Sequence, residues 1–338
     1  MSNKSSKARV AFVVPYVGTW PHYAELFFES CGYNPSVDVV VVTPQSPSGS
    51  LPNNVHVVQM TAAEIIRRLE GVVGLQLGSF RWHKLCDFRP FFGLAFADLL
   101  KPYEFWGYCD TDMVFGDISC VTNPEYLSGI DAFSAHGKQF VGHFTLLRNR
   151  EDINRLGFEI PGWKDLCLTE KAEHLDEERL HDVFRSHPEL RVDLPESLDR
   201  ELEKPFCRHA ITYTFYGKVA DLTDEAYEVV TRWQDGKVFA LRPGGRETEA
   251  LYVHFMALKH PWHWPRDGRV GGSEGGPHYF SRVGYGGVQT PEDLSRLRTR
   301  ILYRRQSLFL DVKRMVGKCA KALLPTEAVR RLRRFLKV

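Results

Sequence analysis

Apolar runs alternate with amphipathic segments along the first third of the chain. The runs at 9–16 and 37–43 are rich in β-branched residues and show no polar alternation. Such runs are typical of strands in a parallel sheet that is covered on both faces. Residues 21–32 join them with apolar positions at helical spacing, and a third strand is expected at 53–60. The pattern therefore predicts an α/β fold that begins with strand–helix–strand units.

The pair Thr61 and Glu64 has capping-box spacing and predicts the start of the next helix. Residues 83–100 are expected to form another helix, bent near Pro90. The strand expected at 103–110 then ends in an acidic segment. Because open α/β sheets bind ligands beside the carboxyl ends of their strands, a site is expected there. Farther along, the pattern predicts strands at 131–137, 142–149, 237–242 and 250–260, and polar helical structure at 151–187.

The composition excludes several classes of protein. With 338 residues, 43% of them hydrophobic, the chain can bury a core in one large domain or two. Its seven cysteines are scattered singly, which argues against a disulfide framework and a zinc site and suits a reducing compartment. No stretch approaches the roughly 20 apolar residues that span a bilayer, and the apolar run near the start lacks the cleavage site of a secretion signal. We expect a cytoplasmic protein.

Basic charge is concentrated at the end of the chain. Residues 291–338 contain 14 Lys or Arg against 4 Asp or Glu, although the whole chain carries a net charge of only +2. The segment 327–338 would form a basic amphipathic helix, which can lie on an anionic membrane surface. A helix packed on the catalytic domain is the alternative. Nucleic-acid binding is disfavoured, because aromatic residues are sparse and no recognition motif occurs. We expect 289–338 to be a helical tail, peripheral on the inner face of the plasma membrane.

The segment "YCDTDMVFGD" at 108–117 concentrates carboxylates in apolar surroundings. Asp110 and Asp112 project to one face if they lie in a strand, and in a turn they can converge on a cation. Paired carboxylate oxygens suit Mn²⁺ or Mg²⁺, which also bind phosphate oxygens. The alternatives are two solvated aspartates or a pair bound to a neighbouring arginine. Asp117 is expected to have a structural role in a cap or turn.

This segment resembles the metal and nucleotide-sugar motif of GT-A glycosyltransferases. Four phrases in the same order, "FVVPYVGTWPHY", "HKLCDFRP", "FWGYCDTDMVFGDI" and "GHFTLLRN", resemble a bacterial group of these enzymes connected with polysaccharides. The resemblance covers about 9–149. It implies a GT-A fold, a Rossmann-like mixed sheet flanked by helices, with a C-terminal helical extension. It also implies that Asp110 contacts ribose and metal and that Asp112 binds the metal.

A second resemblance lies downstream. "HFMALKHPW" at 254–262 is similar to the H-x-x-G-x-x-K-P-W motif of retaining galactosyl- and glucosyltransferases. It implies that His254 is the third metal ligand and that the sugar is transferred with retention of configuration. Because Ala257 replaces the glycine and His260 stands at the lysine position, either Lys259 or His260 would contact the diphosphate. The alternative for His254 is a strand histidine bonded to a backbone carbonyl.

The resemblance also suggests contacts to the donor. Pro15 and Tyr16, which follow the first strand, would lie against the nucleobase. Asp87 would bind a ribose hydroxyl or a base edge, and Lys84 or Arg89 would contact phosphate. The alternative is an ion pair within one helix, because Lys84 and Asp87 are three residues apart.

Three further residues are candidates for contact with the sugar or the acceptor. His143 begins a strand that lines the sugar pocket in similar enzymes, although a core histidine is the alternative. Asp176 and Glu177 would hold the acceptor hydroxyl, and one of them would be the general base of an inverting enzyme. A solvated helix face is the alternative for both acids.

Together these features predict a metal-dependent hexosyltransferase. Its GT-A catalytic domain would occupy 1–288, with a donor half at 8–149, an acceptor half at 150–265 and a glycine-rich loop at 266–288. The substrates would be a nucleotide-diphosphate sugar and a carbohydrate or lipid-linked glycan of a bacterial surface polysaccharide. Dinucleotide-binding and P-loop fingerprints are absent. The alternatives are a catalytically silent carbohydrate-binding or scaffold protein, and a metal-dependent nucleotide phosphohydrolase.

Overall fold

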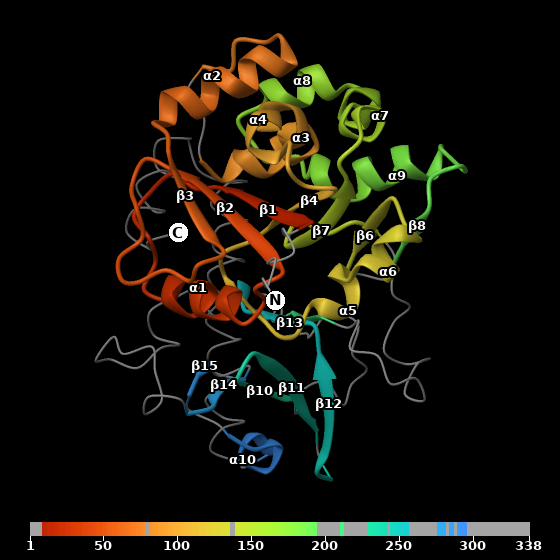
Figure 1. Ribbon diagram of the computed structural model, residues 1–338. Helices are drawn as coiled ribbons and strands as arrows, with labels where there is room; N and C mark the ends of the chain where they lie inside the picture. The colour runs from red at the N-terminus through yellow and green to blue at the C-terminus, as the bar shows by residue number, and fades with distance from the viewer. Residues whose placement is uncertain are drawn as a thin grey trace, which may run out of the picture.

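A mixed β-sheet lies at the centre of the protein (Figure 1). The computed structural model describes residues 9–78, 82–135, 139–194, 210–212, 229–242, 244–256, 276–281, 284–286 and 289–295. Within them the sheet has seven strands in the order β3-β2-β1-β4-β7-β6-β8. The first four of these run parallel to one another, and β7 pairs antiparallel with both β4 and β6. The strands are β1 (Val10–Pro15), β2 (Val37–Thr43), β3 (Val55–Gln59), β4 (Phe105–Cys109), β6 (Ala132–Ser134), β7 (Phe144–Arg148) and β8 (Val192–Asp193).

Helices cover both faces of this sheet because its strands are apolar on both sides. Along β1, Ala11 and Val13 face one core, whereas Phe12 and Val14 face the other. The first core is covered by α2 (Ala62–Val73), α3 (Phe92–Ala95), α4 (Ala97–Leu100), α7 (Glu151–Asn154), α8 (Trp163–Leu168) and α9 (Leu180–Arg185). The second is covered by α1 (Ala24–Gly32), α5 (Ser119–Thr122) and α6 (Pro124–Ser128). The predicted α/β class, with a mixed sheet flanked by helices, is confirmed.

Two local predictions hold in detail. Thr61 and Glu64 form the complete capping box at the start of α2, which ends at Gly74 in the left-handed conformation (φ 66°). The Asp117 carboxylate accepts a hydrogen bond from the Ser119 amide at 2.9 Å, so Asp117 has the structural turn role expected of it.

The segment expected to be one bent helix is broken into three pieces. A 3₁₀ helix, η1 (Trp82–Phe91), precedes α3 and α4. Pro90 has no amide hydrogen to continue an α-helical ladder, and Gly157 packs closely against it. The later helical region is likewise divided, with η2 (Leu156–Glu159) and η3 (Leu175–Arg179) beside the α-helices given above.

Two smaller sheets adjoin the central one. One consists of β5 (Met113–Phe115), β13 (Tyr252–His254) and β9 (Ala210–Thr212), in the order β5-β13-β9. The other consists of β10 (Val230–Gln234), β11 (Lys237–Arg242), β12 (Arg246–Ala250), β14 (His278–Ser281) and β15 (Gly284–Tyr285), in the order β12-β11-β10-β14-β15. The strand expected at 250–260 is therefore shorter, and residues 257–260 lie outside the described chain.

Part of the segment 266–288 differs from the expected loop. Its described residues form β14 and β15, and β14 pairs with β10. The fully buried Phe280 stacks on Phe255 with ring centroids 5.5 Å apart, so apolar packing holds this hairpin in place. In the tail, α10 (Pro291–Ser295) is described and 296–338 are not. Of the helices that the structure describes, none has the length and apolar character to cross a membrane.

Candidate functional site

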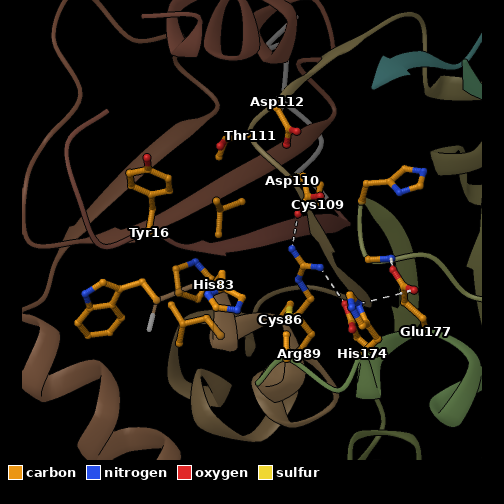
Figure 2. Close-up of a pocket in the computed structure, with 18 of the residues that line it drawn as sticks. Tyr16, His83, Cys86, Arg89, Cys109, Asp110, Thr111, Asp112, His174 and Glu177 are labelled. Atoms are coloured by element: carbon orange, nitrogen blue, oxygen red, sulfur yellow. Dashed lines mark hydrogen bonds and ion pairs between the residues drawn. The ribbon is translucent and has the colours of Figure 1, made fainter. Parts of the chain in front are cut away.

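A cavity of about 1410 Å³ lies where β1 and β4 end (Figure 2). Its walls come from segments that are far apart in the sequence, and the carboxyl ends of parallel strands supply one side, as in other open α/β sheets. Each wall contains residues that the sequence singled out. The lining segments lie within 13–17, 82–92, 109–112, 141–143, 170–177 and 254–256.

Asp110, Asp112 and His254 converge at one side of this cavity. His254 Nε2 lies 3.6 Å from Asp110 Oδ2 and 3.4 Å from Asp112 Oδ2. One ligand atom from each of the three residues lies within 4.8 Å of the other two. Strand pairing explains the convergence: β13 runs antiparallel to β5, with His254 opposite Met113, and the Phe255 amide donates to the Asp112 carbonyl at 2.9 Å. The three residues form a candidate cation site.

The chemistry of these three side chains fits a divalent cation. His254 is only 2% exposed, and neither of its ring nitrogens makes a hydrogen bond to a residue that the structure describes. The backbone-carbonyl alternative for this histidine is therefore not observed within the described chain. Two carboxylates and one imidazole suit Mn²⁺ well, and Mg²⁺ shares the preference for carboxylate oxygen.

Arg89 contacts Oδ1 of the same Asp110 carboxylate. We call Oδ1 the outer oxygen, and we call Oδ2, which faces His254, the inner oxygen. Its Nη2 forms an ion pair with Asp110 Oδ1, and its Nη1 lies 2.8 Å from Asp176 Oδ2. Burial alone would lower the pKa of Arg89, but the two carboxylates outweigh it and raise the pKa well above its usual value. The alternative of a neighbouring arginine is therefore observed at Oδ1 of Asp110, whereas Oδ2 faces His254.

Asp176 and Glu177 differ sharply in their environments. Asp176 is 1% exposed, and its backbone carbonyl accepts a hydrogen bond from the Tyr108 hydroxyl at 2.9 Å. The alternative of a solvated helix face is therefore wrong for Asp176. The Glu177 side chain is 33% exposed, and its Oε2 lies 3.9 Å from His174 Nδ1.

The backbone around these acids is unusual. His174 is in the left-handed conformation (φ 53°), and Glu177 has φ −108° and ψ −116° inside η3. Non-glycine residues rarely adopt the left-handed conformation of His174, and residues in this conformation concentrate at functional sites. Both residues line the cavity.

Burial raises the pKa of Asp176 to about 6, with Arg89 acting in the opposite direction. A carboxyl whose pKa rises on folding contributes stability below its ordinary pKa, and this contribution is lost as the pH rises through 6. We expect the unfolding free energy of the wild type, minus that of Asp176→Asn, to fall by roughly 2–3 kcal/mol between pH 4 and pH 7. Urea unfolding of both proteins at each pH measures this difference. A difference that stays constant or increases contradicts the prediction.

His143 lies half-buried at the cavity wall rather than in a core. Its ring stacks on His254 with centroids 4.3 Å apart and an interplanar angle of 23°. At the end of β1, Pro15 and Tyr16 line the cavity, and Tyr16 stacks on Trp20 with centroids 4.1 Å apart. The structure therefore brings these residues to the same cavity as the cation site.

Lys84 and Asp87 do not line the cavity. Both side chains are fully buried, with Lys84 Nζ 2.6 Å from Asp87 Oδ2. Lys84 also donates to the carbonyls of Leu166 and Lys171, and Asp87 accepts from the Glu173 amide. A donor role for either is not supported, because the protein itself uses their polar groups. The ion-pair alternative is what the structure contains, but in the interior instead of on a helix surface.

Comparison with known proteins assigns the chain to a family. Residues 12–265, about three quarters of the chain, match the model of the family of unknown function DUF6625. The chain belongs to this family. No curated protein matches the sequence.

Several solved structures resemble this family member at a distance. One is the glycosyltransferase GlyE of Streptococcus pneumoniae TIGR4, with 16% identity, a TM-score of 0.32, and coverage of 57% of this chain and 46% of GlyE. Another is a glycosyltransferase involved in glycosylation of the major capsid of PBCV-1, with 11% identity, a TM-score of 0.37, and coverage of 72% and 92%. Mouse xyloside xylosyltransferase 1 has 12% identity, a TM-score of 0.30, and coverage of 56% and 85%. This member of DUF6625 thus spans less than half of GlyE.

A second acidic cluster in this family member does not fit a cation. Cys86, Asp87 and Asp176 each offer one ligand atom within 4.8 Å of the others. However, Asp87 is already satisfied by Lys84 and backbone amides, as described above. Burial, the largest cause, raises the pKa of the Cys86 thiol to about 12, so the thiolate that a metal requires is disfavoured.

The sequence left some residues of the site unidentified. Arg89 Cζ lies over the Tyr108 ring, 5.5 Å from the ring centroid. Gly142 packs against the ion pair between Arg89 and Asp176. The period-two alternation of a strand is the available signal for Tyr108, because it places Tyr108 on the same side as Asp110. No sequence signal identifies Gly142. Lys259 and His260, expected near the diphosphate, lie outside the described residues.

Proposed function

We propose that this chain is a metal-dependent glycosyltransferase. It would move a sugar from a nucleotide-diphosphate sugar to a hydroxyl group of a carbohydrate. The observation that carries the proposal is the convergence of Asp110, Asp112 and His254 within 4.8 Å at the side of a large cavity. Two carboxylates and an imidazole beside a space large enough for a nucleotide sugar fit this activity.

On the donor side, Asp112, His254 and the inner oxygen of Asp110 would hold Mn²⁺ or Mg²⁺. The bound ion would neutralise negative charge on the departing diphosphate. Pro15 and Tyr16 would contact the nucleobase, since they line the same cavity at the end of β1. The motif at 254–262 favours retention of configuration, in which no separate protein base is required. Lys259 or His260 would contact the diphosphate.

On the acceptor side, Glu177 is better suited than Asp176 to contact an incoming hydroxyl. Glu177 is 33% exposed at the cavity, whereas Asp176 is 1% exposed and paired with Arg89. His143 would lie between the cation site and the acceptor, because its ring stacks directly on His254. Surrounding the reacting groups with side chains would also limit hydrolysis of the donor.

A donor screen tests the proposal. The purified full chain would be incubated with Mn²⁺ and each common nucleotide sugar, with and without carbohydrate acceptors, and nucleotide release would be measured. Release that requires both Mn²⁺ and an acceptor supports transfer. Equal release of free sugar with and without acceptor would instead indicate a phosphohydrolase. Absence of metal-dependent donor binding in calorimetry would indicate a silent binding or scaffold protein.

The basic tail suggests where the acceptor is located. A lipid-linked glycan of a surface polysaccharide would lie at the inner face of the plasma membrane, and residues 327–338 carry five Lys or Arg against one Glu. Each basic residue near an anionic surface contributes about 1 kcal/mol. Deleting 325–338 is therefore expected to weaken binding to anionic vesicles at least about tenfold. Sedimentation with anionic and neutral vesicles measures this, and undiminished anionic binding argues against membrane docking through the tail.

A further inference from the structure

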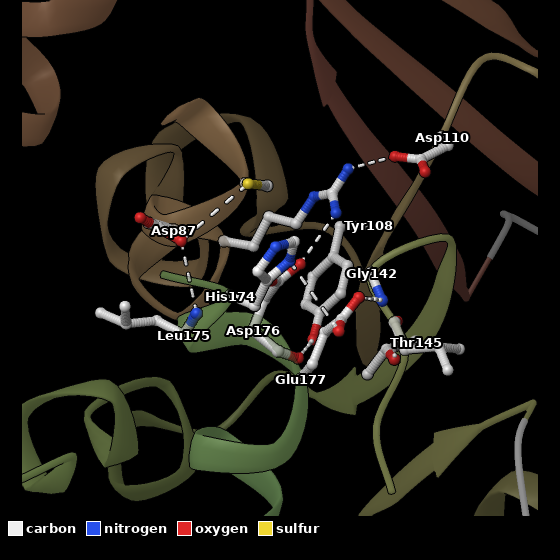
Figure 3. A network of polar contacts seen from close by, with 12 residues as sticks. Asp87, Tyr108, Asp110, Gly142, Thr145, His174, Leu175, Asp176 and Glu177 are labelled. Atoms are coloured by element: carbon white, nitrogen blue, oxygen red, sulfur yellow. Dashed lines mark hydrogen bonds and ion pairs between the residues drawn. The ribbon is translucent and has the colours of Figure 1, made fainter. Parts of the chain in front are cut away.

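We propose that Arg89 is a positioning residue for the metal ligand Asp110. The inference rests on the proposed cation site. It begins from the different contacts of the two oxygens of the Asp110 carboxylate. Oδ1 pairs with the Arg89 guanidinium, as the dashed line at Asp110 in Figure 3 shows. Oδ2 faces His254 Nε2 at 3.6 Å. Holding the outer oxygen leaves the inner oxygen aimed at the place where a cation would bind.

Arg89 can hold Asp110 because it is itself held on its other side. Its Nη1 lies 2.8 Å from Asp176 Oδ2, and its guanidinium lies over the Tyr108 ring. Asp176 is buried, and its backbone carbonyl accepts a hydrogen bond from Tyr108. A planar guanidinium with two nitrogens in fixed directions can bridge two carboxylates, whereas a lysine ammonium is a compact point charge without this geometry.

The bridge joins the two sides of the cavity. Asp110 follows β4 at the cation site, and Asp176 belongs to η3 in the wall that carries Glu177. Groups outside the ligand set that orient ligating carboxylates commonly change metal affinity by 10- to 100-fold. A different role is that of a competing cation, which would repel the metal. The two roles predict opposite changes in metal affinity when the guanidinium is displaced from Asp110.

Gly142 provides an independent way to disturb the bridge. A Cβ added at this position would clash with Arg89 Nη1 and would lie 2.8 Å from Asp176 Oδ2. Gly142 does not have a positive φ, so alanine is compatible with its backbone. Gly142→Ala would therefore displace the ion pair without removing a polar group. In Gly71→Ala, by contrast, the added Cβ meets nothing within 4 Å, which makes it a matched control.

The test is titration with Mn²⁺ alone, monitored by electron paramagnetic resonance and calorimetry, on the full chain and its variants. Arg89→Lys preserves the positive charge but removes the planar guanidinium that can bridge two carboxylates. We expect it to weaken Mn²⁺ binding about tenfold. Gly142→Ala should weaken binding in the same direction, and Gly71→Ala should match the wild type. Thermal unfolding of every variant identifies losses caused by general destabilisation, which the positioning role does not predict.

The outcomes separate this inference from the proposed function. If the wild type binds Mn²⁺ and both Arg89→Lys and Gly142→Ala bind it within about twofold of the wild type, the positioning role is overturned. Tighter binding by Gly142→Ala, whose added methyl group displaces the guanidinium, also overturns it and identifies a competing cation. If Arg89→Lys does not fold, Gly142→Ala decides by the same criterion. If the wild type itself does not bind Mn²⁺, the proposed cation site fails first, and the positioning role fails with it.

Discussion

Asp112→Asn is expected to weaken Mn²⁺ binding by more than about 100-fold and to abolish metal-dependent donor binding, with the fold intact. The reason is that Asp112 is 2% exposed and its Oδ2 faces His254 Nε2 at 3.4 Å. Asparagine has nearly the same shape but removes one negative charge from the proposed ligand set. Changes to groups that only orient ligands cost 10- to 100-fold in affinity, so loss of a ligand charge is expected to cost more.

Calorimetry with Mn²⁺, followed by donor titration in its presence, measures this effect. Asp117→Asn is the matched control, because Asp117 lies in the same ten-residue segment and its amide-accepting role at Ser119 can be kept by asparagine. This control should bind Mn²⁺ like the wild type. Unchanged Mn²⁺ and donor affinity in Asp112→Asn would refute its role as a ligand.

Asp87→Ala is expected to lower the free energy of unfolding by about 3–5 kcal/mol, the usual cost of removing one partner of a buried ion pair. Lys84 would then lose its carboxylate partner in the interior, where its Nζ also donates to the carbonyls of Leu166 and Lys171. The Glu173 amide would also lose its acceptor. Because these contacts attach η1 to the segment that precedes η3, we expect the cavity wall to loosen as well.

Urea or thermal unfolding measures the stability change. The pair Asp182 and Arg185 has the same i,i+3 spacing, but both side chains are well exposed at 63% and 71%. Asp182→Ala should therefore change stability by no more than about 1 kcal/mol, as is typical of surface pairs. A similar small effect in both variants would mean that the buried pair contributes little.

Much of the central sheet could be predicted because its signals are local. The apolar runs became β1, β2 and β3 close to the expected positions, and the capping box at Thr61 marked the start of α2. The acidic segment at the end of β4 was also recognisable, since the strand and both carboxylates are contiguous. The proximity of His254 came from a motif resemblance, and the pairing of β13 with β5 is the physical reason for it.

Other features depend on contacts between distant parts of the chain. The spacing of Lys84 and Asp87 is compatible with a surface ion pair, and only the segment around Leu166 buries them. Likewise, the bridge from Asp110 through Arg89 to Asp176 joins three segments whose separate patterns give no sign of meeting. The glycines around β14 and β15 led to the prediction of a loop instead of this antiparallel pair. The burial of Phe280 accounts for the pair.

The pairing of β5 with β13 also has a consequence for the folding of the chain during its synthesis on the ribosome. Asp110 and Asp112 leave the ribosome long before His254. The nascent chain therefore lacks one of the three proposed ligands until β13 has been made and has paired with β5. An ion bound by all three residues would then link the segment that contains Asp110 and Asp112 to β13, which is synthesised later. A one-residue slip in that docking would turn the imidazole away from the carboxylates, since neighbouring strand positions point to opposite faces.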